Sequence, residues 1–385
     1  MQSPTVGRRR PKDRKDRIAQ VAAELFGERG YHGVSLEEIA AVVGISAPAV
    51  YRHFGSKYAI LVAATRGLVD AALTATEVEG IPATVDALAT FAVTHRKTAG
   101  LYQWEWRYLA AEHRLEFGDD LTLLLRRVAE PLLADRPSLT PAGADAMARA
   151  VLSIFGSLST HRAVIARSRA EGVLRRAALA VLREEPPTPA GRPSVVPYAV
   201  VRVTDRRELL LASAIRRFRH FGYHAVNVDD IASGAGLNAS SVYRYFPGKA
   251  ELLAAAFYRA SDRVAEATAA ALEGARDDKD ALHRLIESYV ELTFERSDLV
   301  SVYLAENNSL PESDRHELRK AQRLHVEEWV RLLLAVRPAL VASEARVLTH
   351  AALNLVTDLG RWVRFDRRTA MDHHLVRLMR RVLMA

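Results

Sequence analysis

The sequence of 385 residues contains one block of sequence twice. Residues 18–61 align with residues 210–253 at a constant offset of 192 without a gap, and sixteen of the 44 aligned positions are identical. A period of this length is far too long for a solenoid, whose repeats are about 20 to 50 residues. The chain therefore contains two copies of a whole domain unit, and its fold must accommodate both.

Composition excludes several classes of protein. The chain has no cysteine, so it forms neither disulfides nor thiolate metal sites. An apolar fraction of 49% is sufficient for substantial cores. The net charge of +8, with an isoelectric point near 9.7, favours an anionic partner. Because no catalytic, cofactor-binding or metal-binding motif is found, we expect neither an enzyme nor a cofactor.

We also expect a soluble cytoplasmic protein that does not enter a membrane. The N-terminus is polar and basic with no apolar stretch behind it, unlike a signal peptide. Charged residues interrupt the apolar runs well short of the length that spans a bilayer.

The first copy begins with a segment that we call head 1, residues 14–61, and it has the pattern of four helices. Gly30 ends the first helix. Ser35, with Glu38 three residues later, is a capping box that opens the second helix. Gly44 then permits a sharp turn before a short third helix.

The second copy begins with head 2, residues 205–253, which repeats each of these devices. Gly222 ends the first helix, Asn227 with Asp230 opens the second, and Gly236 makes the turn. Two short helices joined by a glycine turn form the helix-turn-helix pattern, whose second helix lies in the major groove of DNA. The sequence therefore predicts two DNA-reading heads on one chain.

The third helix of each head is the second helix of this motif, and we call it the recognition helix. We expect its start to face the bases. Small side chains there let the backbone approach the groove, asparagine and serine can hydrogen-bond to bases, and apolar groups can touch thymine methyls. The predicted base-facing residues are Ser46, Ala47, Pro48 and Ala49 in head 1 and Asn238, Ala239, Ser240 and Ser241 in head 2.

A second set of residues is predicted to bind phosphates. Phenol, guanidinium and imidazole groups behind the recognition helix are good phosphate donors, and a lysine at the first turn of the next helix lies where backbone N–H groups also favour an anion. These residues are Tyr51, Arg52, His53 and Lys57 in head 1 and Tyr243, Arg244, Tyr245 and Lys249 in head 2, together with the capping residues Ser35 and Asn227. The alternative for the first tyrosine of each head is that its ring packs in the core.

Basic residues crowd the start of the chain. Residues 1–13, which we call the basic arm, include Arg9 and Arg10 and lead directly into head 1. Such a run is either a solvated tail or a contact with phosphates or the minor groove, and the adjacent DNA-reading motif favours the second interpretation.

The repeated block resembles the DNA-binding head of the TetR family of transcriptional repressors. The resemblance lies in the segments Ala-Pro-Ala-Val-Tyr-Arg-His-Phe-Gly-Ser-Lys and Ala-Ser-Ser-Val-Tyr-Arg-Tyr-Phe-Pro-Gly-Lys, which begin at Ala47 and Ala239. It implies an all-α fold, with the base and phosphate contacts given above. The layout is similar to that of tandem-unit TetR regulators that control genes of lipid and sterol uptake or catabolism.

The rest of each copy has helical patterns and no strand signal. We call residues 62–185 body 1 and residues 254–385 body 2, and the proline-rich residues 186–204 between the copies predict an extended linker. The two bodies correspond only weakly. One matching pair is Tyr108 with Tyr303, each at the start of a Tyr-Leu-Ala run.

Members of the TetR family normally carry one such unit and act as homodimers, whereas here both units share a chain. We therefore predict that helices near 142–168 and 170–183 pack against helices near 343–364 and 371–384. This four-helix interface would make an intramolecular pseudo-dimer and bring the recognition helices into successive major grooves, roughly 34–36 Å apart. The sequence leaves open whether two chains associate further on DNA.

Aromatic residues in both bodies suggest a binding site for a small, apolar ligand. A helix with aromatic residues on two faces is buried between its neighbours or borders a cavity, and buried polar groups need partners, of which a ligand is one. The candidates are Phe91, His95, Tyr102, Trp104, Tyr108 and Phe155 in body 1 and Tyr289, Tyr303, Trp329, Asn354 and Asp358 in body 2. For each aromatic residue the alternative is an ordinary place in the core.

These features predict a repressor that binds double-stranded DNA and is released by a small apolar effector. Because the two recognition helices differ in sequence, the operator is expected to be imperfect or non-palindromic. The alternative is an architectural protein that binds DNA without sequence specificity and without an effector.

Overall fold

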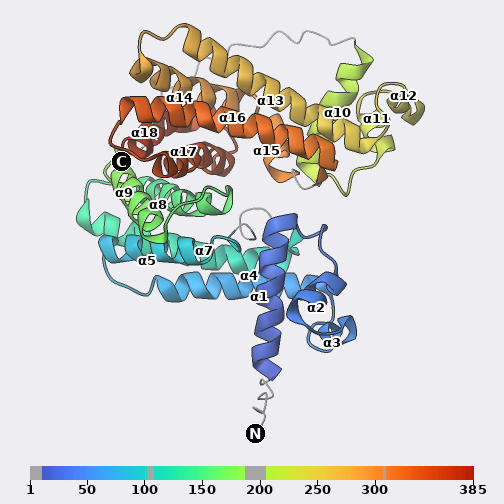
Figure 1. Ribbon diagram of the computed structural model, residues 1–385, viewed down its shortest axis with the longest axis horizontal. Coiled ribbons are helices and arrows are strands. Elements are labelled where there is room, and N and C mark those ends of the chain that lie inside the picture. Colours follow the sequence, from blue (N-terminus) through green and yellow to red (C-terminus); the bar gives the residue numbers. More distant parts are fainter. Residues whose placement is uncertain (1–10, 100, 102–107, 187–204, 307–308) are drawn as a thin grey trace, which may run out of the picture. The chain divides into compact units, whose positions relative to one another are not determined.

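The computed structural model describes residues 11–99, 101, 108–186, 205–306 and 309–385, and within them all regular elements are helices (Figure 1). The all-α fold class predicted from the sequence is therefore confirmed. The chain forms two compact units. Unit 1 holds the chain up to Ala148 with Phe155–Arg162, and unit 2 holds Arg149–Ile154 with Ala163–Ala385.

Several predicted features lie outside the described residues. They are Arg9 and Arg10 of the basic arm, the ligand candidates Tyr102 and Trp104, and residues 187–204 of the linker. Their predicted roles stay predictions.

Unit 1 contains head 1 and the larger part of body 1. Its helices are α1 (Pro11–Arg29), α2 (Leu36–Val43), α3 (Ala47–Tyr51), α4 (Lys57–Ala75), α5 (Ile81–Thr94), α7 (Ala111–Asp135), α8 (Pro141–Gly156), whose residues 149–154 belong to unit 2, and the 3-10 helix η2 (Ser157–Ser159). The first helix packs on α4 and α2, and α5 and α7 pack on each other and on α4 (Figure 1).

The core of head 1 is continuous with the core of the following helices. Phe26 and Phe54 are buried with Ile39 between α1, α2 and α3, as expected for apolar residues at helical spacing. The same cluster includes Leu109 and Phe117, which lie beyond the head. Because each fully buried side chain of this kind contributes about 1.5–3 kcal/mol, the head is held to α4 and α7 by apolar packing.

Unit 2 contains head 2, body 2 and one helix of body 1. Its helices are α9 (Arg167–Leu182), α10 (Arg206–Phe221), α11 (Val228–Gly234), α12 (Ala239–Tyr243), α13 (Lys249–Glu273), α14 (Asp278–Glu295), α15 (Ser297–Ala305), α16 (Glu312–Val336), α17 (Ala342–Trp362), the 3-10 helix η4 (Arg367–Thr369) and α18 (Met371–Leu383). In Figure 1, α10, α11 and α12 gather at one end of the long α13. Helix α17 is largely buried, and it packs against α9, α14, α16 and α18.

The bounds of the helices correct one pairing between the two bodies. The 25-residue helices α7 and α16 both end at an Arg-Pro pair, and they correspond at an offset of 201. At this offset Tyr108 corresponds to Ser309, and Tyr303 corresponds to Tyr102. The pairing of Tyr108 with Tyr303 was therefore wrong, because a short run of common residue types matched out of register.

α9 comes from the first copy of the sequence but lies within unit 2. It packs against α17 and α18 of the second copy, and its buried face includes Val173, Leu174 and Ala177. This packing confirms one part of the predicted contact between the copies. The pseudo-two-fold arrangement of the two heads stays a prediction.

An ion cluster follows the end of α9. The carboxylate of Glu184 is 8% exposed and accepts hydrogen bonds from Arg377 at 3.2 Å and from Arg381 at 2.6 Å, both on α18. Burial alone would raise the pKa of Glu184, but the hydrogen bonds and charges of Arg381 and Arg377 outweigh it and leave the pKa below its usual value.

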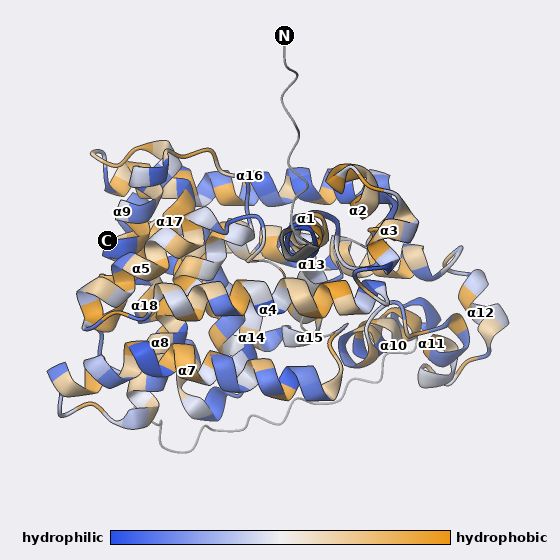
Figure 2. Ribbon diagram, turned by 90° about the horizontal axis from the view of Figure 1, so that it is seen from below, coloured by the Kyte–Doolittle hydropathy of each residue, from blue (hydrophilic) through white to orange (hydrophobic). Residues whose placement is uncertain are grey.

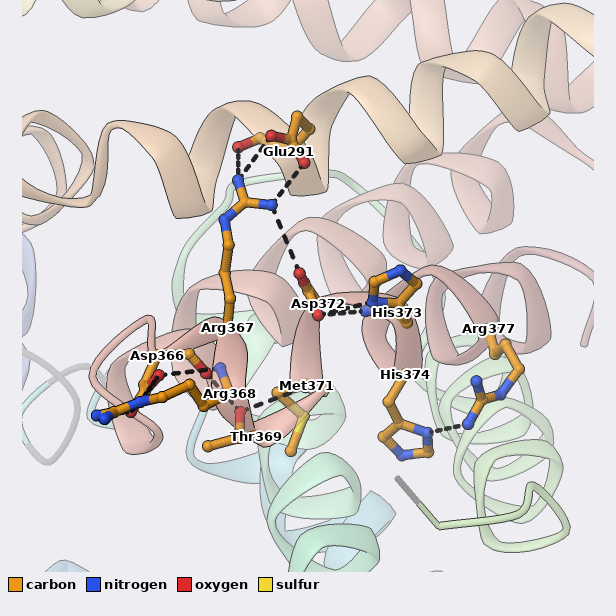
Figure 3. Close-up of polar contacts among 10 residues, drawn as sticks. All are labelled: Glu291, Asp366, Arg367, Arg368, Thr369, Met371, Asp372, His373, His374 and Arg377. Carbon is orange, nitrogen blue, oxygen red and sulfur yellow. Dashed lines mark hydrogen bonds and ion pairs between the residues drawn. The ribbon is translucent and has the colours of Figure 1, made fainter. Parts of the chain in front are cut away.

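A tight corner joins α17 to α18 (Figure 3). Arg367 holds this corner against α14 through a forked contact with Glu291, and it also lies 3.5 Å from Asp372. Next on α18, His374 is fully buried and its Nδ1 accepts a hydrogen bond from Arg377 at 3.1 Å. Burial, with a smaller effect of Arg377, lowers the pKa of His374 to about 4, so the ring is neutral at pH 7.

Helix α4 is long and apolar enough, by length and composition alone, to cross a membrane, although Arg66 and Asp70 interrupt its apolar run. Figure 2 shows apolar turns along this helix. Its apolar residues include Ile60, Leu61, Leu68 and Val69, which are buried in the core that α4 shares with head 1. Packing within unit 1 thus accounts for the apolar character of α4.

Candidate nucleic-acid interface

The capping box and the glycine turn predicted for head 1 are both present in the structure. The Ser35 hydroxyl accepts the Glu38 N–H at 3.2 Å, and the Glu38 carboxylate accepts the Ser35 N–H at 2.7 Å, which completes the capping box of α2. Gly44 ends α2 with a φ of 78°, a left-handed conformation that glycine adopts without strain. The turn leads directly into α3, with Pro48 in its first turn, where the missing N–H costs nothing.

Head 2 uses the same devices with different residues. Asn227 and Asp230 form the capping box of α11, and Gly236 makes the turn with a φ of 70°. The third helix, α12, is capped by Asn238, whose Oδ1 accepts the Ser241 N–H at 3.0 Å. In head 1, by contrast, the Ser46 side chain makes no cap hydrogen bond.

The tyrosines that end the recognition helices are exposed. Tyr51 is 54% exposed and Tyr243 is 60% exposed, although both are large and partly apolar. The alternative that their rings pack in the core is therefore wrong. Their neighbours Arg52 and Arg244 are also exposed, so each head presents a phenol and a guanidinium together at the end of its recognition helix.

Other predicted residues are less accessible. Ala49 is 7% exposed and lies in the core of head 1, so its prediction as a base-facing residue is corrected. The reason is that it lies next to Val50, and both face inward on a helix of only five residues. His53 is half-buried, and Tyr245 packs against the core of head 2 while keeping part of its surface accessible.

Both predicted lysines are engaged inside their heads. Lys57 donates to the Val34 carbonyl at 2.8 Å, and its ammonium lies 4.4 Å from the ring centre of Tyr31. Lys249 donates to two carbonyls, those of Tyr223 and Val226, and lies over the Tyr223 ring at 4.2 Å. Each lysine thus fastens the start of the fourth helix to the turn before the second helix. A phosphate contact from either lysine stays a prediction.

A pair of cations matched between the heads was missed by the sequence reasoning. Lys15 lies 5.2 Å from the ring centre of Phe54, and Arg207 lies 5.0 Å from that of Phe246. The two pairs are related by the offset of 192, so extending the alignment three residues before residue 18 would have matched the two cations. Contacts of this kind contribute about 0.5–1 kcal/mol at exposed sites.

The ligand candidates of body 1 separate into two groups. Phe91 stacks on His95 at a centroid distance of 4.5 Å, and burial lowers the pKa of His95 below its usual value. Tyr108 instead packs against His32 and Tyr31, at centroid distances of 4.6 Å and 5.7 Å. It belongs to the joint between head 1 and the following helices. Phe155 is buried.

Two of the ligand candidates of body 2, Tyr289 and Trp329, lie in a polar and aromatic cluster. Tyr289 lies 5.9 Å from Trp329, and the indole N–H of Trp329 donates to Nε2 of His325 at 3.1 Å. Burial, together with the charge of Tyr303, raises the pKa of Tyr289 to about 12, and a hydrogen bond with Thr357 opposes it. We call Tyr289, His325 and Trp329 the aromatic cluster.

The sequence reasoning missed His325. Burial lowers its pKa to about 4, with the charge of Glu328 opposing, so it is neutral at pH 7. Its Nδ1 lies 3.3 Å from the hydroxyl of Thr268 on α13. A histidine four residues before a tryptophan on the same helix was the available signal, because residues at this spacing share a helix face.

Asn354 and Asp358 have a different role from the predicted one. The Asn354 amide donates to the backbone carbonyl and the hydroxyl of Ser153, both at 3.0 Å, and to the Asp358 carboxylate at 2.8 Å. The Ser153 hydroxyl donates to Asp358 at 2.8 Å, and Arg361 pairs with the same carboxylate. The buried Asn354 and the partly exposed Asp358 thus find polar partners in α17 and in the segment of α8 that belongs to unit 2, which corrects the prediction that they need a ligand.

A groove of about 600 Å³ lies between α10 and α13 of unit 2. Charged residues, among them Arg207, Arg259, Asp262 and Arg263, make up much of its lining. This lining does not match the apolar ligand predicted from the sequence.

Comparison with known protein families accounts for both heads and for body 2. The model of the bacterial regulatory proteins of the tetR family matches residues 18–64 and 210–256. The model of the tetracyclin repressor-like C-terminal domain matches residues 275–382. Together the matches cover more than half of the chain. The chain belongs to the TetR family. This is a family of transcriptional regulators and not of enzymes, as expected from the sequence.

Individual TetR relatives match parts of the chain. The HTH-type transcriptional activator FasR of Mycolicibacterium smegmatis is 40% identical over 65 residues, which are 17% of this chain and 30% of FasR. The HTH-type transcriptional repressor KstR2 of Rhodococcus jostii is 29% identical over 126 residues, which are 30% of this chain and 61% of KstR2. The chain thus spans less than two thirds of the length of these curated relatives.

Solved structures include similar TetR proteins. The ketosteroid transcriptional regulator KstR2 of Mycobacterium tuberculosis matches with a TM-score of 0.41 and 21% identity, over 46% of this chain and 94% of that protein.

Proposed function

We propose that the protein is a cytoplasmic, sequence-specific transcriptional repressor that binds one operator through two non-identical heads. The observation that carries this proposal is the repeated surface at the end of each recognition helix. Tyr51 with Arg52, and Tyr243 with Arg244, are exposed side by side in both heads. Large exposed phenols next to guanidinium groups are well suited to bind the phosphates that flank a major groove.

The two recognition helices favour different half-sites. In head 1 the exposed start of α3 presents Pro48, which is apolar and suits a thymine methyl. In head 2 the Ser240 and Ser241 hydroxyls both donate to the Asn238 oxygen, at 2.9 Å and 2.6 Å. Because their protons point inward, these hydroxyls offer lone pairs to the groove, which suits the amino groups of adenine or cytosine. An imperfect operator follows from this difference.

The packing of α9 on α17 and α18 supports an intramolecular pseudo-dimer. It joins a helix of the first copy to two helices of the second, as the subunits of a homodimer would be joined. We infer that one chain then supplies both heads, with recognition helices roughly 34–36 Å apart on successive major grooves. Further association of two chains on DNA is an outcome that stoichiometry decides.

We further propose that a small, mainly apolar effector releases the protein from DNA by binding beside the aromatic cluster of body 2. Tyr289, His325 and Trp329 offer apolar faces with a few polar atoms, which is the usual composition of a small-molecule site. Effector binding would shift the heads away from the spacing that lets both reach DNA. Losing one of two linked contacts lowers the overall affinity by about 10²–10⁴-fold.

Selection of binding sites from random duplex DNA tests the proposal, followed by light scattering of the complex. The expected result is a discrete site with two different half-sites, bound by one chain. The double variant Tyr51→Ala and Tyr243→Ala should abolish selection, whereas Leu115→Ala, an exposed residue of α7, should not change it. Binding without a preferred sequence would favour the architectural alternative, and a perfect palindrome bound by two chains would exclude the pseudo-dimer.

A further inference from the structure

A buried carboxylate joins head 2 to body 2. Glu306 directly follows α15 and is 1% exposed. One of its oxygens accepts the backbone N–H of Tyr223 at 3.0 Å, and the other accepts the Ser309 hydroxyl at 3.3 Å. Tyr223 lies in the turn between α10 and α11, so a single side chain connects the body to the start of the helix-turn-helix.

The conformation of the turn between α10 and α11 directs the backbone N–H of Tyr223 toward body 2. Gly222 ends α10 with a φ of 78°, in the left-handed region that favours glycine. On the other side of the same residue, the Tyr223 carbonyl accepts a hydrogen bond from Lys249 at 2.9 Å. Both backbone polar groups of Tyr223 are therefore held, the N–H by body 2 and the carbonyl by the first residue of α13.

The charges of this joint support one another. Burial lowers the pKa of Lys249 below its usual value, and the negative charge of Glu306 opposes this effect. A buried carboxylate is costly unless it is hydrogen-bonded and near a cation, and Glu306 has both kinds of neighbour. Removing Glu306 therefore affects both the turn and the lysine that fastens it.

Helix α15 leads from the apolar core that head 2 shares with α13 to this joint. It packs on α10 and α13, and Tyr303 lies on it three residues before Glu306. The ring of Tyr303 is 4.9 Å from that of Phe257 on α13. Because one helical turn moves nearly as a rigid body, a displacement at Tyr303 displaces Glu306.

We propose that Glu306 is a positioning residue that sets the orientation of head 2 on body 2 and carries a displacement of α15 to that head. This proposal rests on the proposed function, since it presupposes a DNA-binding head.

Amide hydrogen exchange of the full-length chain tests the first part directly, without DNA. In Glu306→Ala the Tyr223 amide loses its acceptor, and we expect it to exchange at least about tenfold faster than in the unmodified protein. Glu306→Gln keeps an acceptor oxygen and should lie between the two. Glu317→Gln, an exposed glutamate of α16, is the matched control and should leave this amide unchanged. Unchanged exchange in a folded Glu306→Ala protein would overturn the proposal.

A double-mutant cycle tests transmission through α15. Tyr303→Leu should speed exchange at the Tyr223 amide when Glu306 is present and add nothing in the Glu306→Ala background, because both changes then act through one link. Independent, additive effects of the two substitutions would overturn transmission through Glu306.

Binding to the selected operator separates this proposal from the proposed function. Glu306→Ala should weaken binding about tenfold on the intact operator and have no effect on a duplex whose head 2 half-site is scrambled. Equal losses on both duplexes would overturn the positioning role. If the unmodified chain selects no site, the proposed function fails, while the exchange measurements still decide whether Glu306 holds the turn.

Discussion

The Glu184 carboxylate accepts a hydrogen bond of 2.6 Å from Arg381, which ties the end of the first copy to the last helix of the second. The carboxylate is almost fully buried, whereas the arginine keeps about half of its surface exposed. A buried charge that loses its partner destabilises a protein more than the pair stabilises it. This contact is therefore a sensitive probe of the packing of α9 on α18.

Arg381→Ala is expected to lower the free energy of unfolding by about 1–3 kcal/mol, because the buried carboxylate of Glu184 loses its shortest hydrogen bond to an arginine. The lower end of this range is expected, since solvent screens the exposed arginine. Arg380→Ala, the adjacent exposed residue on the same helix, is the control and should change stability by less than about 0.5 kcal/mol. Urea denaturation of the purified variants measures both values. Equal effects of the two substitutions would contradict the assigned role of the ion cluster.

The same cluster predicts a dependence of stability on pH. The pKa of Glu184 is lower in the folded protein than its usual value of 4.5, so the folded state favours the charged form. Its contribution to stability is complete above pH 4.5 and decreases as the pH falls through the folded pKa. Glu184→Gln should remove this part of the loss. Denaturation curves of both proteins between pH 6 and 3 measure the difference.

The caps of the two recognition helices predict different effects of matched substitutions. Asn238 caps α12 through its side chain, whereas Ser46 makes no cap hydrogen bond to α3. Asn238→Ala should therefore destabilise head 2 by about 1 kcal/mol, and Ser46→Ala should have little effect on head 1. Hydrogen exchange of the two heads measures local stability. The same loss in both heads would show that the cap of α12 does not stabilise it.

The local devices of the heads were predictable because they are encoded within a few residues. Ser35 with Glu38, and Asn227 with Asp230, occupy cap positions whose chemistry depends only on neighbours along the chain. Both helix-turn-helix motifs therefore followed from the sequence. The exposure of Tyr51 and Tyr243 was harder to predict, because an aromatic side chain is as common in a core as at a phosphate site.

The bodies were less predictable because their contacts are distant in the sequence. Asn354 was expected to need a ligand, but Ser153, about 200 residues earlier, satisfies it. His325 gave no motif, and its importance depends on Tyr289 of another helix. Glu306 is one of many glutamates in the sequence, and only the fold brings it to the Tyr223 amide.

A close backbone approach joins head 1 to the segment that follows α5. A Cβ atom on Gly27 of α1 would collide with the backbone carbonyl oxygen of Lys97, whereas one on Gly67 of α4 would meet open space. Gly27→Ala should therefore destabilise the protein by about 1–3 kcal/mol, because backbone atoms must shift. Gly67→Ala should stabilise it by up to about 1 kcal/mol, because alanine is the better helix former. Thermal denaturation of both variants measures the effects, and a stabilising Gly27→Ala would exclude the close contact.

The aromatic cluster predicts how the protein responds to an apolar ligand. A ligand that binds only the folded state at 100 times its Kd raises the free energy of unfolding by about 2.7 kcal/mol. Screening fatty acids, acyl thioesters and sterols by thermal denaturation should find such a compound, and Tyr289→Ala or Trp329→Ala should remove its effect.

Phe91→Ala in body 1 is the matched control for this screen, and it should leave the response unchanged if body 2 holds the site. Because the pKa of His325 is about 4, its ring is neutral at pH 6 and at pH 8, so ligand affinity should be the same at both values. An affinity that falls steeply between pH 8 and pH 6 would show that a different ionisable group contacts the ligand. Loss of the response in Phe91→Ala alone would place the site in body 1.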